Sequence, residues 1–367
     1  MNTTLLGGIT FVLVFAGIIL LHELGHFVVA RLFHIEVEEF GFGFPPRIVK
    51  LFSWKGTDFT LNWIPLGGFN KIKGEDDPNV PGGMAAANPW KRIPVLLAGA
   101  AMNLLTAVFV YTLFFSQVGI PNQHTVVVGI VSAGSPAEQS GLKTGDVVVS
   151  AGGQPVDSTK RLIDITYASL GKPLQLEIHR LGQVLEFTII PRSNPPAGDG
   201  PMGISIGNPI HPPKSWFETI PTSFSAVGGD INSLLSLPGR IIAGTVSSQE
   251  AQIGGPRSIW NLFQQSVSRD VASLQPVSGS NPSAAPTNYT LMVIISLTIT
   301  VGVANLLPIP ALDGWRIFMS LTEIIIRRRI PAKFQASING VGFLVLLTLL
   351  AFFYIKDFIN PVNFILP

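Results

Sequence analysis

The sequence predicts a polytopic α-helical membrane protein with four transmembrane helices and one compact α/β domain outside the bilayer. Of its 367 residues, 47% are hydrophobic and only 13% are charged, whereas soluble domains carry about 25% charged residues. Four stretches are apolar enough, and long enough or nearly so, to cross about 30 Å of hydrocarbon. They lie at roughly 5–32, 93–116, 290–309 and 337–355. From Thr125 to Pro191, by contrast, short strand-like runs alternate with turns, which is typical of a compact mixed domain.

Composition also excludes several classes of function. The net charge of +2 is too small to favour a nucleic-acid partner, and the mean hydropathy of +0.44 favours the lipid bilayer as the surroundings of much of the chain. The chain contains no cysteine, so disulfides, zinc ribbons and thiol catalysis are excluded.

The distribution of Lys and Arg orients the predicted spans. The N-terminal tail has no basic residue, whereas eight lie between Arg31 and Arg92 and five lie between Arg316 and Lys333. Cytoplasmic loops carry the excess of basic residues. We therefore expect both termini and the 117–289 region outside, and the two basic loops inside.

We expect four regions along the chain. They are a first membrane half (1–116), an external domain (117–193), a linker with an amphipathic outer segment (194–289), and a second membrane half (290–367). Residues 193–213 are rich in Pro and Gly, which predicts a linker. Apolar residues at helical spacing predict an amphipathic helix over 215–245, and a further helix is expected near 158–169.

The first span contains a polar motif, HELGH, at residues 22–26. On a helix, His22 and His26 lie on one face about 6 Å apart along the axis, where two imidazoles can bind one zinc ion. Glu23 lies one position further round and can act as a general base without being a ligand. The alternative is a chance match. A charged residue at a bilayer centre costs about 2.5–3.5 kcal/mol, which favours a functional role.

Asp313 is the candidate for a third ligand, because a catalytic zinc site has about three protein ligands. It follows the proline-interrupted end of the third span, in NLLPIPALDGWRIF at residues 305–318. The predicted topology brings the ends of spans one and three to the same inner side. Alone, Asp313 would be interpreted as an ordinary helix N-cap. With HELGH at the same depth, the ligand interpretation is favoured.

These two motifs together carry a family resemblance. HELGH in a first span, with N-x-x-P-x-P-x-L-D-G at 305–314, resembles the site-2 protease family of intramembrane zinc metalloproteases, nearest its bacterial RseP-like branch. The resemblance implies one zinc ion per chain, held by His22, His26 and Asp313, with Glu23 as the catalytic base. It also implies that Asn305 binds the substrate backbone near the metal.

Two further stretches extend the resemblance into the first membrane half. FTLNWIPLGGF, residues 59–69, resembles the family's membrane-associated β-hairpin, which implies that Gly67, Gly68 and Phe69 present an edge strand to an unwound substrate. The alternative is a hairpin that only packs against the spans. AGAAMNLL, residues 98–105, resembles the family's second-span motif, with Gly99 and Asn103 kept and Ala100 in the place of the usual proline.

The external domain resembles a PDZ domain. GSPAEQSGLKTGDVVVSAGGQPV, residues 134–156, follows the PDZ pattern except that Ala151-Gly152-Gly153 replaces the usual V-N-G. Residues 125–193 leave room for one such domain. Two roles stay open, namely binding a peptide C-terminus of the substrate, or excluding substrates with bulky external domains. IGGPRSIW, residues 253–260, resembles the family's outer G-P-x-x-I stretch.

The function implied by the resemblance is regulated intramembrane proteolysis of single-span membrane proteins, such as anti-sigma factors or remnant signal peptides. The active site would lie near the cytoplasmic face of a bacterial inner or plasma membrane, and the PDZ-like domain outside. One alternative is a catalytically inactive membrane scaffold that uses the PDZ-like domain. A complete ligand set argues against this. A transporter is another alternative, but the sequence shows no internal repeat to support it.

Overall fold

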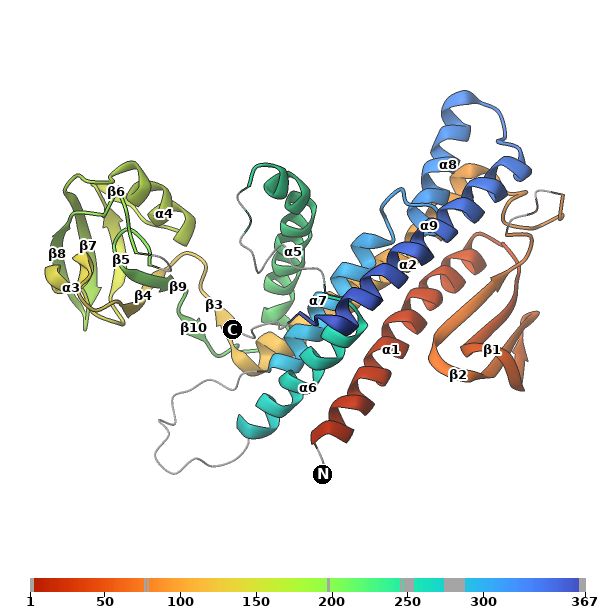
Figure 1. Cartoon of the computed structure of the whole chain (residues 1–367), viewed down its shortest axis with the longest axis horizontal. Helices are drawn as coiled ribbons and strands as arrows, with labels where there is room; N and C mark the ends of the chain where they lie inside the picture. Colours follow the sequence, from red (N-terminus) through yellow and green to blue (C-terminus); the bar gives the residue numbers. More distant parts are fainter. Residues whose placement is uncertain are drawn as a thin grey trace. The chain divides into compact units, whose positions relative to one another are not determined.

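The computed structural model describes residues 3–75, 77, 79–196, 199–244, 246, 254–273 and 288–362. The chain divides into two compact units, each with its own hydrophobic core. The first unit combines Met1–Phe115 with Trp216–Pro367, and the second is Ser116–Ser215 (Figure 1). The candidate ligands and the candidate base all belong to the first unit.

Long apolar helices dominate the first unit. They are α1 (Thr3–Leu32), α2 (Pro89–Val118), α5 (Thr219–Ile242), α6 (Pro256–Ser273), α7 (Tyr289–Ala304), α8 (Asp313–Ile326) and α9 (Ala332–Ile359), with the short 3-10 helix η1 (Trp216–Glu218) before α5. Among the described residues, α1, α2 and the Phe334–Ile359 part of α9 are long and apolar enough to cross a membrane. They coincide with the predicted spans at 5–32, 93–116 and 337–355. The protein is therefore an integral membrane protein.

The third predicted span is shorter than expected. Helix α7 ends at Ala304 and has 16 residues, which corresponds to about 24 Å, whereas the hydrocarbon core is about 30 Å thick. The chain beyond it contains Pro308 and Pro310, which cannot donate helical hydrogen bonds, and Ala311 adopts a positive φ of 76°. The expectation of a helix continuing to residue 309 is wrong for this reason, and a fourth span stays a prediction.

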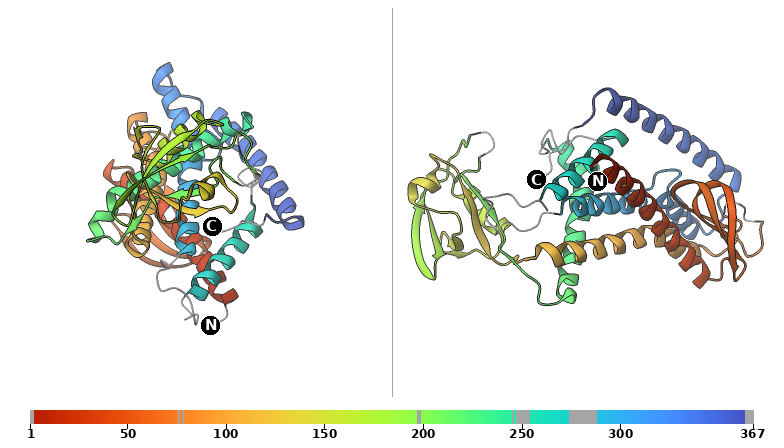
Figure 2. Two further views of the ribbon diagram at one scale, coloured as in Figure 1. Left: turned by 90° about the vertical axis from the view of Figure 1, so that its left-hand side faces the viewer. Right: turned by 90° about the horizontal axis from the view of Figure 1, so that it is seen from below.

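The aromatic face of α1 near its N-terminus packs on α6. The Phe11 ring lies 5.3 Å from that of Trp260 and 5.6 Å from that of Phe263, both in edge-to-face geometry. Phe263 is fully buried. Both views in Figure 2 show α1 and α6 side by side. The predicted amphipathic helix over 215–245 is α5, and residues 245, 247–253 and 274–287 of the expected outer segment lie outside the described part.

A β-hairpin joins α1 to α2 and lies beside the C-terminal half of α1 (Figure 1). Its strands are β1 (Val37–Trp54) and β2 (Thr57–Ile72). Residues 39–42 of β1 pair on one side with 58–61 of β2 and on the other side with 68–71 of the same strand. Strand β2 therefore bends around β1. Its last residues, 68–72, form an outer edge that has no further strand partner in the described structure.

The second unit is built on an antiparallel sheet with the strand order β8-β7-β5-β4-β9, in which β6 pairs with β5. Its elements are β3 (Ile120–Pro121), β4 (Val126–Val131), α3 (Pro136–Ser140), β5 (Val147–Ala151), β6 (Gln154–Pro155), α4 (Thr159–Ala168), β7 (Leu174–Arg180), β8 (Gln183–Ile189), β9 (Ile204–Gly207) and β10 (Ile210–His211). Gly152 and Gly153 both have positive φ, 58° and 74°. A tight hairpin turn requires this, and Gly-Gly satisfies it as well as Asn-Gly.

Strand β9 corrects the expected linker over 193–213. Residues 204–207 pair with β4, and Met202 is buried in the core of this unit. The Pro- and Gly-rich flanks of the segment favoured a linker. A four-residue strand at the edge of a sheet needs only a short alternating pattern. Here Ile204 and Ile206 pack on the core, and small residues alternate with them.

Candidate metal centre

Three side chains from two distant parts of the first unit converge on one point. His22 and His26 lie on one face of α1, and Asp313 is the first residue of α8. The His22 and His26 Nε2 atoms are 3.1 Å apart, and Asp313 Oδ2 lies 3.1 Å from each of them. The three atoms form a triangle, as expected for ligands of one metal ion.

This triangle fits zinc. Tetrahedral zinc bonds of about 2.0–2.1 Å place neighbouring ligand atoms about 3.3 Å apart, close to the 3.1 Å separations here. Both histidines present Nε2 to the centre, and two imidazoles with one carboxylate form a typical catalytic zinc ligand set that leaves a further position free. His22 and His26 are buried, so their positions are held by packing.

Each imidazole is oriented through its second nitrogen. His26 Nδ1 donates to the Val95 backbone carbonyl oxygen at 2.7 Å, which leaves the lone pair of Nε2 free to bind a metal ion. His22 Nδ1 lies 3.4 Å from the side-chain amide of the fully buried Asn103. The Asn103 carbonyl oxygen has no partner among the described residues, and the amide turned over would accept from His22 Nδ1–H. Such partners fix the tautomer of a metal-binding histidine.

Two glycines allow the helices to approach at this point. A β-carbon on Gly99 of α2 would lie 2.4 Å from His26 Nε2 and 2.6 Å from His22 Cε1. A β-carbon on Gly314 would lie 2.2 Å from the Leu307 carbonyl oxygen. The Gly314 backbone N–H instead donates to the Asn305 carbonyl oxygen at 2.7 Å. This bond fixes the start of α8 and hence Asp313.

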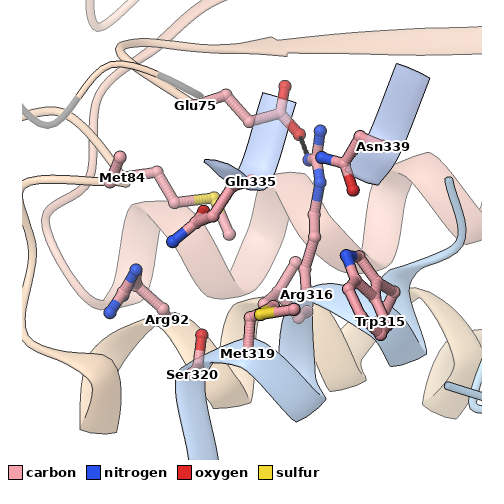
Figure 3. Close-up of a pocket in the computed structure, with 11 residues that line it drawn as sticks. Glu75, Met84, Arg92, Trp315, Arg316, Met319, Ser320, Gln335 and Asn339 are labelled. Atoms are coloured by element: carbon pink, nitrogen blue, oxygen red, sulfur yellow. Dashed lines mark hydrogen bonds and ion pairs between the residues drawn. The ribbon is translucent and has the colours of Figure 1, made fainter. Parts of the chain in front are cut away.

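A cavity of about 140 Å³ lies against the three ligand side chains. Its other lining residues are Glu23, Asn70, Ile72, Glu75, Met84 and Leu96. Glu23 therefore shares the cavity with the three candidate ligands, which its predicted role as a general base requires. A smaller neighbouring cavity shares Glu75, Met84 and Leu96 with it. Figure 3 shows the ion pair of Glu75 with Arg316 in this neighbouring cavity.

The predicted substrate-binding residues lie around this cavity without lining it. Gly67 and Gly68 face the side chains of Ile19 and Leu20 on α1, and the Phe69 ring lies over Gly41 of β1. Asn305 is the C-cap of α7 and contributes its backbone carbonyl to Gly314. Whether these four residues bind substrate stays a prediction.

The structure also adds two polar residues, Asn70 and Glu75, to the cavity. Neither was singled out from the sequence. Asn70 follows the Gly-Gly-Phe stretch directly, and alternation along a strand places it on the face opposite Phe69. That signal could have identified Asn70, whereas the sequence holds no comparable signal for Glu75.

Comparisons with known proteins agree with this chemistry. The family model described as Peptidase family M50 matches residues 10–349. The chain is 33% identical over 353 residues to a protein of Clostridium perfringens, covering 95% of this chain and 98% of that protein. It is 29% identical to a Campylobacter jejuni protein, over 94% and 91% of the two chains, and 30% identical to one of Helicobacter pylori, over 93% and 97%. Each relative is named "Putative zinc metalloprotease".

Proposed function

Because the chain belongs to peptidase family M50 and is a membrane-embedded zinc metalloprotease, we propose that it hydrolyses peptide bonds in or near the transmembrane segments of other membrane proteins. The observation that carries this proposal is the position of the candidate site. His22, Glu23 and His26 lie within α1, a helix apolar enough to span the bilayer. A protease whose ligands are part of a transmembrane helix acts on substrates that reach it through the membrane.

The residues of the cavity have distinct proposed roles. His22, His26 and Asp313 hold one zinc ion, which supplies Lewis acidity to the scissile carbonyl and makes a water molecule nucleophilic at neutral pH. The Glu23 carboxylate accepts the proton of the attacking water and delivers it to the leaving amine nitrogen. Asn103 and the Val95 carbonyl keep both imidazoles in the tautomer that binds metal.

The outer edge of β2 is the proposed docking place for the substrate. A transmembrane helix satisfies its own backbone hydrogen bonds, so the substrate must unwind before its carbonyl is reached. The unpaired edge at residues 68–72 can pair with the unwound segment by β-strand addition. Gly67, Gly68 and Phe69 would shape that edge, and Asn305 would support Asp313 through Gly314 in addition to any contact with the substrate.

We also propose how the chain is oriented in the membrane, from its exposed apolar side chains and its basic residues. The hairpin exposes large apolar side chains, among them Phe52, Trp54 and Trp63, which suits a membrane-associated element. Basic residues concentrate between Arg31 and Arg92, which favours the cytoplasmic side for the hairpin and the zinc centre. With α7 as a short fourth span, the second unit lies outside, and a bacterial inner or plasma membrane is the expected location.

The second unit is the proposed PDZ-like domain. A groove of about 250 Å³ runs between α4 and the edge strand β9, and its lining includes Leu162, Tyr167 and Ile206. An edge strand beside a helix suits an extended peptide, which supports binding of a substrate C-terminus over exclusion by size alone. Anti-sigma factors and remnant signal peptides are candidate substrates of the whole protein.

The variant Glu23→Gln tests the proposed function. In full-length protein reconstituted into lipid vesicles with a single-span substrate, we expect wild type to cleave and Glu23→Gln to lose at least about 100-fold in rate. Zinc content should stay near one ion per chain in both, because Glu23 is not a ligand. Full activity of Glu23→Gln would refute the assigned mechanism. A zinc-free, inert wild type would instead favour the inactive scaffold.

A further inference from the structure

Asn70 is a polar side chain that the fold itself does not use. It lies on the outer edge of β2, opposite Phe40 of β1 in the register of the hairpin. Its side-chain nitrogen and oxygen are both buried, and neither has a hydrogen-bond partner among the described residues. Burying an amide without a partner is unfavourable, so this side chain is expected to have a partner when the protein works.

The Asn70 side chain is placed on the face of β2 that looks into the metal cavity. Asn70 and Ile72 both line the cavity together with Glu23 and the three ligands. The alternate residues serve the opposite face, because the Phe69 ring contacts Gly41 and Lys71 forms an exposed ion pair with Glu38. Strand alternation therefore directs the Asn70 side-chain amide into the cavity and not to the outer surface of the hairpin.

None of the described protein groups around Asn70 forms a hydrogen bond with its side-chain amide. His26 is held by Val95, and His22 lies against Asn103, so neither imidazole depends on Asn70. The metal set is complete with two histidines and one carboxylate, and zinc favours these ligands over an amide. Asn70 also makes no hydrogen bond to Glu23. A peptide group of a bound substrate offers the acceptor that a free amide in this cavity matches.

We propose that Asn70 is a substrate-binding residue whose side-chain amide donates to a backbone carbonyl of the unwound substrate, at a peptide group next to the scissile bond. This role rests on the proposed function, and it adds a specific contact to the substrate backbone. A segment aligned on the edge of β2 would run past the cavity that Asn70 and Glu23 both line. The Asn70 side-chain amide at this edge would then prevent the substrate from sliding along β2.

Binding to an inactive enzyme tests this contact separately from catalysis. Full-length Glu23→Gln protein in lipid nanodiscs would be titrated with a fluorescent single-span peptide, and compared with Glu23→Gln/Asn70→Leu, in which Leu has nearly the shape of Asn. We expect the Kd to rise about tenfold, the size of one hydrogen bond to a group left unpaired. The matched control Glu23→Gln/Lys50→Leu, altered at an exposed position of β1 outside this edge, should stay within about twofold.

Peptides with one backbone amide replaced by an ester locate the partner, because an ester carbonyl is the weaker acceptor. Across the three peptide groups on either side of the scissile bond, we expect one ester that weakens binding about fivefold when Asn70 is present and less than twofold in the Asn70→Leu protein. Zinc content and thermal midpoint should match between the two proteins.

Three results would overturn the role of Asn70. They are an unchanged Kd in the Asn70→Leu protein, ester effects that are equal in both proteins, or loss of zinc or of thermal stability on substitution. The last would show that Asn70 is structural. Failure of the proposed function is distinct. It would appear as a wild type that does not cleave the peptide, or as a Glu23→Gln protein that does.

Discussion

Two aspartates, one in each compact unit, differ in what surrounds them: Asp146 is buried and Asp313 is partly buried. Asp146 in the second unit is 1% exposed and accepts from Arg180 Nε and a terminal guanidinium nitrogen, both at 2.6 Å, and from the Lys143 backbone N–H at 2.8 Å. Burial alone would raise the pKa of Asp146, but these donors outweigh it and hold that pKa below its usual range. Asp313 in the first unit faces two histidine nitrogens at 3.1 Å.

The difference separates a carboxylate that stabilises the fold from one that we propose as a zinc ligand. Asp146 has its countercharge within the chain, so its burial is compensated on folding. Asp313 shares its site with two imidazoles already oriented by Asn103 and the Val95 carbonyl, and zinc is the cation that all three ligands can share.

The largest effect is expected for Asp313→Ala. Removing a ligand leaves two histidines, so we expect zinc affinity to fall by more than about 100-fold, beyond the 10- to 100-fold typical of losing an outer partner. Cleavage should become undetectable. Zinc content after dialysis and substrate cleavage measure both, with Asp146→Asn as the matched carboxylate control. Near-full zinc occupancy in Asp313→Ala would exclude Asp313 as a ligand.

A smaller but still large loss is expected for Gly99→Ala. The new β-carbon would meet both imidazoles at less than 3 Å, so the ligands must move, and displacement of about 1 Å can cost about 100-fold in rate. The control is Gly17→Ala on α1, where no atom of the described residues lies within 4 Å of an added β-carbon. Equal cleavage rates for the two alanine variants would contradict the close approach of α2 to the ligands.

Asn103→Ala tests the orientation of His22. Its amide lies 3.4 Å from His22 Nδ1, and losing such a partner typically weakens metal binding by about 10- to 100-fold. Chelator competition gives the zinc Kd directly. An unchanged zinc Kd would show that packing alone orients His22.

The smallest effect on the reaction, and a clear effect on stability, is expected for Asp146→Asn. Loss of the paired charge should lower the free energy of unfolding of the second unit by about 2 kcal/mol, less than for a fully buried pair because Arg180 is partly exposed. Susceptibility of the 116–215 region to a soluble protease, measured in the full chain, reports this. Zinc content should not change.

The same variant gives a pH test with a defined sign. The pKa of Asp146 is lowered in the folded state, so its contribution is present above the unfolded value of about 3.9 and is lost as pH falls through the folded value. The second unit should therefore weaken in acid below about pH 4. In Asp146→Asn this part of the pH dependence should disappear, and an unaltered acid profile would contradict the assignment.

Much of this site follows from local sequence rules, and the rest depends on register. The four-residue spacing of His22 and His26 fixes their common face on a helix, and the basic loops place Asp313 at the same depth. The structure brings these three together. Strand alternation alone places Asn70 on the face opposite Phe69, but its position beside the ligands depends on β2 pairing with β1 twice. Such a bend has no periodic signature.

The elements of the fold also divide into those that local sequence rules predict and those that they miss. The long apolar runs of α1, α2 and α9 were predicted because length and hydropathy suffice for a span. Strand β9 was missed because four residues between Pro201 and Pro209 carry too little pattern to outweigh their flanks. Helix α7 ends at Ala304 because in a continuing helix the ring of Pro308 would clash with the Ala304 carbonyl, whereas the predicted span ran on to residue 309.

Mapping the cleaved bond tests the central claim most directly. Wild-type protein in lipid vesicles would be incubated with a single-span substrate in ¹⁸O-labelled water, and the products identified by mass spectrometry. We expect one cut inside the transmembrane segment, one ¹⁸O atom in the new carboxyl terminus, and no product from Glu23→Gln. Cleavage confined to the soluble flanks of the substrate, or the same products from Glu23→Gln, would contradict a zinc centre built for proteolysis within the membrane.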